Sequence, residues 1–152
     1  MQTEEAAALL AAYGIPTTEG PPPADGAELV AGVLADPDLG PMLACGPGGP
    51  AVELLGDAAV RLAPLSREDA ADLVRSLRSF PLLTGYRGSE PADVRAFEDV
   101  LVRLAALADA HPEVSEIDCD PVLASGRGAV VAEARIFVRP SAPPRPFPAL
   151  DR

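Results

Sequence analysis

Two stretches of the chain repeat their apolar residues with the spacing of a helix. The pattern predicts helices over residues 66–79 and 91–110, and Ser66 and Pro91 suit the first positions of these helices. A shorter helix is predicted over residues 3–13. The side chains expected to be buried are Ala70, Leu73, Val74 and Leu77 in one long helix, and Val94, Phe97, Leu101, Leu104 and Leu107 in the other.

Apolar runs bounded by turn residues predict strands on both sides of the two long helices. They cover residues 28–36 and 42–45 before the helices, and residues 115–124 and 129–139 after them. The connections are short and suit antiparallel pairing. The order β-β-α-α-β-β therefore predicts an α+β fold, with one antiparallel sheet and two main helices packed on one face.

Proline-rich segments divide the chain. Residues 1–18 hold the N-terminal helix, and residues 19–26 contain three consecutive prolines, which favour an extended linker. We expect the α+β domain to span residues 27–139. Residues 140–152 are again rich in proline and are predicted to form a disordered or surface-lying tail.

Composition excludes several kinds of function. The chain has 152 residues, 48% of them hydrophobic, with 23 acidic and 12 basic residues and a net charge of −11. It contains no lysine, which rules out chemistry at a lysine amine. The negative charge argues against nucleic acid as a partner, and no apolar run is long enough for a membrane span. The two cysteines, Cys45 and Cys119, are expected to be reduced core residues of a cytoplasmic protein.

The most informative segment is the acidic run that begins at Glu116. Strand alternation places Glu116, Asp118 and Asp120 on one face. If residues 125–128 close a hairpin, Asp120 lies opposite Glu133 and Asp118 lies opposite Arg135. Two adjacent carboxylates indicate a bound cation such as Mg²⁺ or Mn²⁺, a shared proton, or a solvated acidic face in which Asp118 and Arg135 form an ion pair.

A glycine-rich segment at residues 46–50 follows a predicted strand. Glycine loops let backbone N–H groups approach a phosphate, but the two prolines here each remove a donor, so an ordinary turn is the simpler interpretation. Glu53 follows this segment and is either buried beside it or exposed. Arg61 and Arg87 are candidates to bind anions, with ordinary solvated side chains as the simpler interpretation, and His111 is interpreted as a helix-capping or surface residue.

Several motifs together resemble a known family. Residues 28–139 resemble the C-terminal part of the ATP-grasp domain of ADP-forming acyl-CoA synthetases, the succinyl-CoA-synthetase-like group. The matching segments, in order, are Asp36-Pro37-Asp38-Leu39-Gly40-Pro41, Gly46-Pro47-Gly48-Gly49 with Val52-Glu53-Leu54-Leu55, Arg61-Leu62-Ala63-Pro64-Leu65, Pro81-Leu82-Leu83-Thr84-Gly85-Tyr86-Arg87-Gly88, and Glu116-Ile117-Asp118-Cys119-Asp120-Pro121-Val122. The same domain also occurs fused to acetyltransferase domains.

This resemblance implies ATP and Mg²⁺ as ligands. The family's Asn-Pro asparagine and an acidic residue of the next strand hold the Mg²⁺ of Mg-ATP, and they fall on Asp120 and Glu133, with Asp118 nearby. Both positions depart from the usual asparagine and aspartate but keep oxygen ligands. The resemblance also places a second group of residues near the nucleotide phosphates: Gly46, Gly48, Gly49 and Glu53.

One lobe of the family's domain has no counterpart in this chain. Residues 5–20 resemble the start of the ATP-grasp domain, and the family's next lobe, which carries a nucleotide-binding lysine, is replaced by the short linker. The CoA-binding part is also absent, and His111 does not match the family's phosphorylated histidine. We therefore expect a non-catalytic interaction or regulatory module that self-associates or binds a partner carrying the missing lobe or the CoA-binding domain. The alternative is the Mg-ATP-binding part of an acid–CoA ligase or acetyltransferase assembly.

Overall fold

The structure of the protein, a computed structural model, describes residues 3–18, 26–49 and 56–140. Its helical elements are α1 (Thr3–Ala12), α3 (Arg67–Arg75), α4 (Val94–Ala110) and the 3₁₀ turns η1 (Phe80–Leu83) and η2 (Tyr86–Gly88). Its strands are β1 (Ala27–Asp36), β2 (Gly40–Pro47), β3 (Ala59–Leu62), β4 (Val114–Ser125), β5 (Gly128–Val131) and β6 (Ala134–Val138). Most of the predicted linker, nearly all of the tail, and Glu53 lie outside the described residues.

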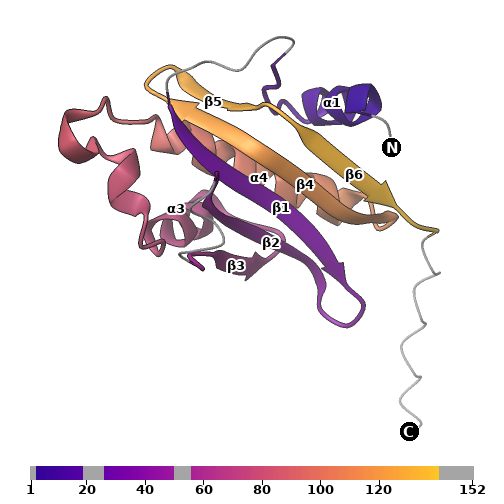
Figure 1. Cartoon of the computed structure of the whole chain (residues 1–152). Coiled ribbons are helices and arrows are strands. Elements are labelled where there is room, and N and C mark those ends of the chain that lie inside the picture. Colours follow the sequence, from indigo (N-terminus) through magenta and orange to yellow (C-terminus); the bar gives the residue numbers. More distant parts are fainter. Residues whose placement is uncertain (1–2, 19–25, 50–55, 141–152) are drawn as a thin grey trace, which may run out of the picture.

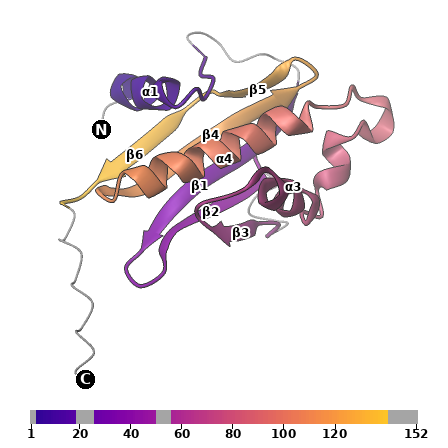
Figure 2. The same ribbon diagram turned by 180° about the vertical axis from the view of Figure 1, so that it is seen from behind.

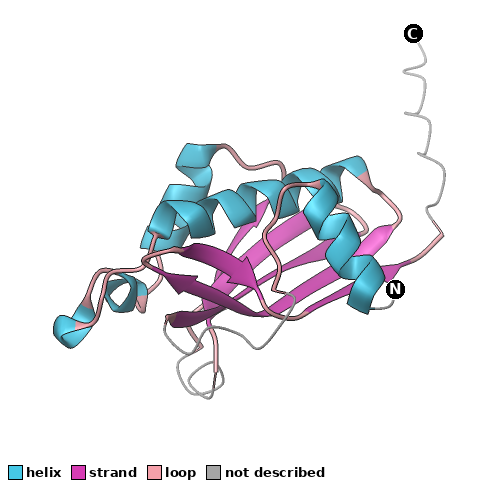
Figure 3. Ribbon diagram, turned by 90° about the horizontal axis from the view of Figure 1, so that it is seen from above, coloured by secondary structure: helices cyan, strands magenta, loops and turns pink. Residues whose placement is uncertain are grey.

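The strands form one antiparallel sheet, as predicted. Their order is β3-β2-β1-β4-β5, and β6 also pairs with β4, farther along that long strand (Figure 1). Helices α3 and α4 both lie against the same face of the sheet (Figure 2). Helix α1 lies on the helical side next to β6 (Figure 3). No described helix covers the opposite face, which we call the open face.

The predicted helical faces form the core between α3, α4 and the sheet. Ala70, Leu73, Val74 and Leu77 are all buried, and so are Phe97, Leu101, Leu104 and Leu107, whereas Val94 is only partly buried. Burial of large apolar side chains at the centre of α4 is the main source of stability in such a layer. The α+β prediction is therefore confirmed. No helix in the described part of the chain is long and apolar enough to cross a membrane.

The two cysteines lie on either side of the central strand β1. Ala31 pairs with Cys45 of β2 on one side and with Cys119 of β4 on the other. Both thiols are free and buried, 2% and 0% exposed, as expected from the sequence. They therefore pack into the helix-covered face at the middle of the sheet.

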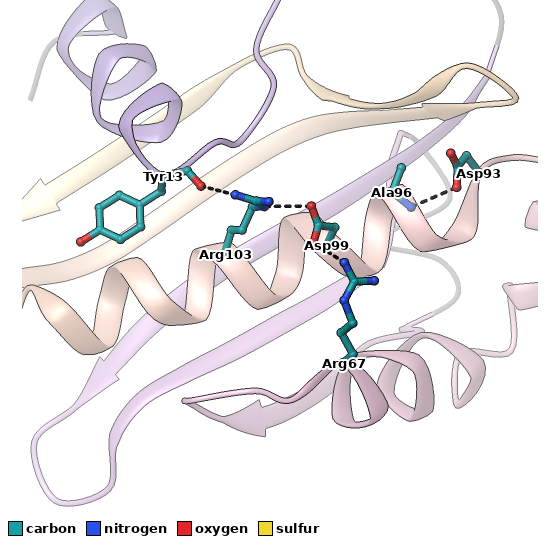
Figure 4. A network of polar contacts seen from close by, with 6 residues as sticks. All are labelled: Tyr13, Arg67, Asp93, Ala96, Asp99 and Arg103. Carbon is teal, nitrogen blue, oxygen red and sulfur yellow. Dashed lines mark hydrogen bonds and ion pairs between the residues drawn. The ribbon is translucent and has the colours of Figure 1, made fainter.

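A single ionic network joins the three helices (Figure 4). Asp99 of α4 accepts hydrogen bonds from Arg67 of α3 at 3.1 Å and from Arg103 of α4 at 2.8 Å. Arg103 also donates to the backbone carbonyl of Tyr13, just beyond the end of α1, at 2.9 Å. A guanidinium at the C-terminal end of a helix satisfies a free carbonyl and complements the helix dipole. Asp99 thus links the docking of α1 and of α3 to α4.

Both long helices are shorter than predicted. Helix α3 ends at Arg75 rather than near residue 79, because the N–H groups of Arg78 and Ser79 donate to the carboxylate of Asp57 at 3.0 and 2.8 Å. Partial burial opposes ionisation of Asp57, but the bonds from Ser79 and Arg78 hold its pKa below the ordinary value. Helix α4 begins at Val94 rather than Pro91, because Asp93 caps it through the N–H of residue 96 at 3.1 Å (Figure 4).

The strand predicted over residues 129–139 is divided into β5 and β6. The break at residues 132–133 lies opposite Asp120-Pro121 of β4. Proline has no N–H to donate to a sheet ladder, so the regular pairing is interrupted at this point. The residues of the break still bond to β4: Asp120 donates to the Glu133 carbonyl at 3.1 Å and Ala132 to the Pro121 carbonyl at 3.0 Å.

Candidate functional site

Strand β4 carries alternating carboxylates on the open face. Glu116, Asp118 and Asp120 are exposed, whereas the intervening Ile117 and Cys119 are 1% and 0% exposed. This is the alternation expected from the sequence. The open face therefore has a line of acidic side chains along one of its central strands.

The predicted register across the hairpin is confirmed. Asp118 pairs with Arg135 and Cys119 with Ala134, and the backbone N–H of Asp120 donates to the carbonyl of Glu133 at 3.1 Å. Asp120 and Glu133 are therefore direct cross-strand neighbours, as expected. The ion pairs found among the described residues do not include Asp118 with Arg135. A cavity of about 180 Å³ is lined by Asp118, Asp120, Glu133, Ala134 and Arg135.

Negative charges around this cavity oppose the ionisation of Asp120. Partial burial of its carboxyl group raises the pKa of Asp120 above its ordinary value, and the charges of Asp118, Glu28 and Glu133 raise it further. A carboxylate in such a position gains from a cation that neutralises its neighbours. The group is therefore suited to bind either a proton or a metal ion.

Glu28 of β1 is a member of this site that sequence reasoning missed. Its charge acts on Asp120, and its backbone carbonyl accepts a hydrogen bond from the N–H of Gly48 at 2.7 Å. A side chain on Gly49, whose φ is +73°, would start 2.8 Å from the Glu28 carboxylate. Glu28 thus connects the acidic line to the glycine-rich segment. The sequence shows Glu28 at the start of a strand but not that β1 pairs with β4.

The glycine-rich segment is not simply a loop. Gly46 and Pro47 belong to β2, and a side chain on Gly46 would start 2.5 Å from the carbonyl oxygen of Asp57, so Gly46 is packed under the backbone. Gly48 is bonded to the start of β1. At Gly46 and Gly48 the backbone of another segment leaves little room for a side chain, which explains why both positions are glycine. Gly49 comes next along the chain, after these two close approaches. Glu53 lies outside the described residues.

Asp120 and Glu133 fit the coordination chemistry of Mg²⁺. Among the described residues no three His, Cys, Asp or Glu side chains are close enough to hold a metal ion between them, so Asp118 does not complete a three-ligand cage. Magnesium is commonly held by one or two carboxylates, with phosphate oxygens and water completing an octahedron. Asp120 and Glu133 lie opposite each other, and neither forms an ion pair with another residue in the described part of the chain, so they match that requirement.

The remaining polar candidates have local structural partners. Arg61 forms an ion pair with Asp69 at 2.8 Å, and Arg87 lies over the ring of Tyr86 at 5.3 Å. His111 caps α4 and lies between Tyr13 and Glu113, with contacts of 2.9 and 3.1 Å. Their interpretation as surface or capping residues agrees with these contacts.

Comparison with known families identifies the domain. Residues 20–138 match the family model described as an ATP-grasp domain. The chain belongs to the ATP-grasp family. The beta subunit of acetate–CoA ligase [ADP-forming] I of Pyrococcus furiosus is 37% identical over 113 residues, which are 74% of this chain and 49% of that subunit. Acetate–CoA ligase [ADP-forming] I of Archaeoglobus fulgidus is 41% identical over 113 residues, 74% of this chain and 16% of that protein.

Solved structures of similar chains confirm the fold. A dinucleotide-forming acetyl-coenzyme A synthetase 1 of Ca. Korarchaeum cryptofilum, solved with coenzyme A and Mg-AMPPCP, superposes with a TM-score of 0.87 at 29% identity, covering 91% of this chain and 92% of that one. PH1788 of Pyrococcus horikoshii gives 0.74 at 34% identity, covering 80% and 52%. The chain spans about half, or less, of the curated relatives, so it corresponds to part of an ATP-grasp domain related to those of ADP-forming acid–CoA ligases.

Proposed function

We propose that this ATP-grasp domain binds the Mg²⁺-bound phosphates of ATP within an ADP-forming acid–CoA ligase assembly. The observation that carries the proposal is the pair formed by Asp120 of β4 and Glu133, which lies opposite Asp120 in the break between β5 and β6. Partial burial and the charges of Asp118, Glu28 and Glu133 raise the pKa of Asp120. A neighbouring cation would relieve that repulsion.

In this proposal the carboxylates of Asp120 and Glu133 hold Mg²⁺, which when bound neutralises charge on the phosphates. Gly49 lies at the edge of the same region, where a side chain added to it would meet the Glu28 carboxylate. A cavity of about 450 Å³ extends from Glu28 and Gly48 to Glu90 and Ser125. Its carboxylates can accept hydrogen bonds from hydroxyl groups, which suits the sugar end of a nucleotide.

The rest of the reaction requires a partner in this proposal. The chain has no lysine to contact the phosphates, and it spans 49% of the Pyrococcus furiosus subunit it matches. The partner would supply the missing lobe and the CoA-binding domain, either in an acyl-CoA synthetase or beside an acetyltransferase. We expect no acyl-CoA synthesis by this chain alone.

Isothermal titration with Mg-ATP tests the proposal. We expect binding heat at millimolar nucleotide, and a loss of about tenfold or more in affinity for Asp120→Ala because one of two metal ligands is removed. Asp38→Ala, which removes an exposed carboxylate from the β1–β2 turn, is the matched control and should bind like the parent. Absence of heat, or equal affinity in Asp120→Ala, would contradict nucleotide binding at this site.

A second candidate function is that of an interaction or regulatory module. It is supported by three large apolar side chains that are exposed on the β1–β3 side of the sheet: Leu34 at 55%, Val60 at 58% and Leu62 at 45%. Contiguous exposed apolar side chains are typical of surfaces that bind another protein. This function does not require nucleotide binding.

A further inference from the structure

The open face has an apolar half on strands β1, β2 and β3. In the sheet register, Leu34 pairs with Met42 and Met42 with Leu62, while Gly32 pairs with Ala44 and Ala44 with Val60. Paired residues point to the same side of a sheet, so these side chains form two adjacent rows. We define the apolar half as Leu34, Met42, Ala44, Val60 and Leu62.

The carboxylates of β4 border the apolar half directly. Leu34 pairs with Glu116, and Gly32 pairs with Asp118. Each row therefore runs from apolar side chains on β3 and β2 to a carboxylate on β4. The open face is therefore not uniformly acidic: in these rows its apolar side chains end at β1, and the carboxylates begin at β4.

A groove of about 300 Å³ lies on that line, between the apolar half and the two carboxylates. Gly32, Leu34, Met42, Val60, Glu116 and Asp118 are among its lining residues. Its depth depends on Gly32, where a side chain would start 2.8 Å from the carbonyl oxygen of Ile117. The groove thus has apolar walls over most of its length and carboxylates at one side.

Such a groove matches a side chain with an apolar stem and a cationic end. We propose that it receives a lysine or arginine of a partner polypeptide, whose neighbouring apolar residues cover Leu34, Val60 and Leu62. The inference rests on the second candidate function, the interaction module, and names the chemistry of its partner. It does not depend on Mg-nucleotide binding.

Charge favours such a partner over a second copy of this chain. Each copy carries a net charge of −11, so two copies repel. Placing two open faces together with their apolar halves in contact sets Glu116 against Glu116 or carboxylates against apolar side chains. Either arrangement buries carboxylates against other carboxylates or against apolar side chains, which is costly. A partner with basic residues at the border of an apolar face avoids both problems.

The test uses a defined probe: a helical peptide with leucines on one face and arginines along its border. Its control is a scrambled peptide of the same composition that has no apolar face. At physiological salt, titration calorimetry should show one site for the amphipathic peptide and at least tenfold weaker binding of the scrambled one. Glu116→Gln, which removes one carboxylate of the groove, should weaken binding severalfold.

Val60→Arg provides the sharpest variant. Val60 is 58% exposed, so the substitution leaves the core intact and places a cationic side chain of the protein itself in the groove. We expect at least a tenfold loss of peptide binding, whereas Val60→Thr, which keeps the shape, should bind within about twofold of the parent. Circular dichroism melting checks that both variants are folded.

Two results would overturn the inference: equal binding of the two peptides, which indicates attraction by net charge alone, or unchanged binding in Val60→Arg. The Mg-ATP titration separates this inference from nucleotide binding. Val60→Arg should leave that titration unchanged, and Asp120→Ala should reduce it while leaving a peptide site on β1–β3. Either activity can therefore fail without the other.

Discussion

Asp120 costs the folded domain stability when it is ionised, yet its ionised form is the one that would bind a cation. Burial and the charges of Asp118, Glu28 and Glu133 all oppose its ionisation. A group whose pKa is raised on folding destabilises the folded state once pH rises above its ordinary pKa, near 4 for aspartate. A cation bound beside Asp120 in the functional state would offset this loss of stability and explain why an acidic residue stands there.

Asp120→Asn should stabilise the isolated domain at neutral pH. Removing a charge that faces like charges across a sheet is worth on the order of 0.2–1 kcal/mol. The gain should be present at pH 7 and disappear as pH falls below about 4, where the parent carboxyl is protonated in both states. Urea unfolding of parent, Asp120→Asn and the turn variant Asp38→Asn at pH 7 and pH 3.5 measures it. A destabilised Asp120→Asn at pH 7 would contradict this account.

Site residues could be predicted from the sequence where a short turn joins the segments that carry them. Asp120 lies on β4 and Glu133 lies just after β5, and a tight turn joins these two strands, so the pairing follows from counting outward from residues 125–128. Glu28 was not predictable in the same way, because β1 and β4 are separated by most of the chain and their register is fixed by core packing. The backbone packing of Gly46 likewise depends on Asp57, in a segment whose path has no local signal.

At the scale of elements, a polar contact fixes the end of α1, whose Ala6 and Leu10 are buried in the core. Arg103 donates to the carbonyl of Tyr13, and Gly14 follows with a φ of +72°. A side chain on Gly14 would start in contact with the Arg103 guanidinium. The end of α1 therefore requires both the left-handed backbone that glycine adopts and the space that it leaves.

Gly14→Ala should loosen α1 more than it destabilises the rest of the domain. The left-handed backbone costs a non-glycine residue about 1–2 kcal/mol, and the displaced guanidinium adds to this. Gly40→Ala is the matched control, because Gly40 has a φ of +85° but no heavy atom within 4 Å of the added carbon. Hydrogen exchange should accelerate in α1 for Gly14→Ala and not for Gly40→Ala. Equal protection of α1 in both variants would show that the Arg103 contact does not hold it.

Helices and strands were predicted from periodicity, and their ends were not. The buried side of α3 follows from its apolar spacing, but its end depends on Asp57, which is remote in sequence and binds the N–H groups of Arg78 and Ser79. Strand β3 was not predicted from the sequence, because it has only four residues and is exposed along most of its length. Its membership in the sheet comes from pairing with β2.

At the scale of the whole molecule, a net charge of −11 makes stability sensitive to cations of two kinds. Monovalent salt screens the general repulsion. A divalent ion bound by Asp120 and Glu133 adds a stabilisation that depends on occupancy, about 1.4 kcal/mol at ten times its dissociation constant. These two contributions can be separated at equal ionic strength.

We expect MgCl₂ to raise the melting temperature more than NaCl of the same ionic strength. For a domain of this size, 1.4 kcal/mol corresponds to about 3–6 °C. The melting temperature of Asp120→Ala should be the same in the two salts, while Asp38→Ala should melt higher in MgCl₂, like the parent. Scanning calorimetry measures these melting temperatures. If the parent melts at the same temperature in the two salts, Mg²⁺ is not held by this pair in the absence of nucleotide.

The placement of Cys45 and Cys119 on either side of Ala31 has a consequence for the dynamics of the sheet. Burial, with smaller effects from Asp57 and Asp118 respectively, raises the pKa of each thiol to about 12, so neither is a reactive thiolate in the folded protein. A thiol reagent can therefore modify them only when the helix layer separates from the middle of the sheet. The labelling rate of the unaltered chain measures how often the core between the helices and the sheet opens.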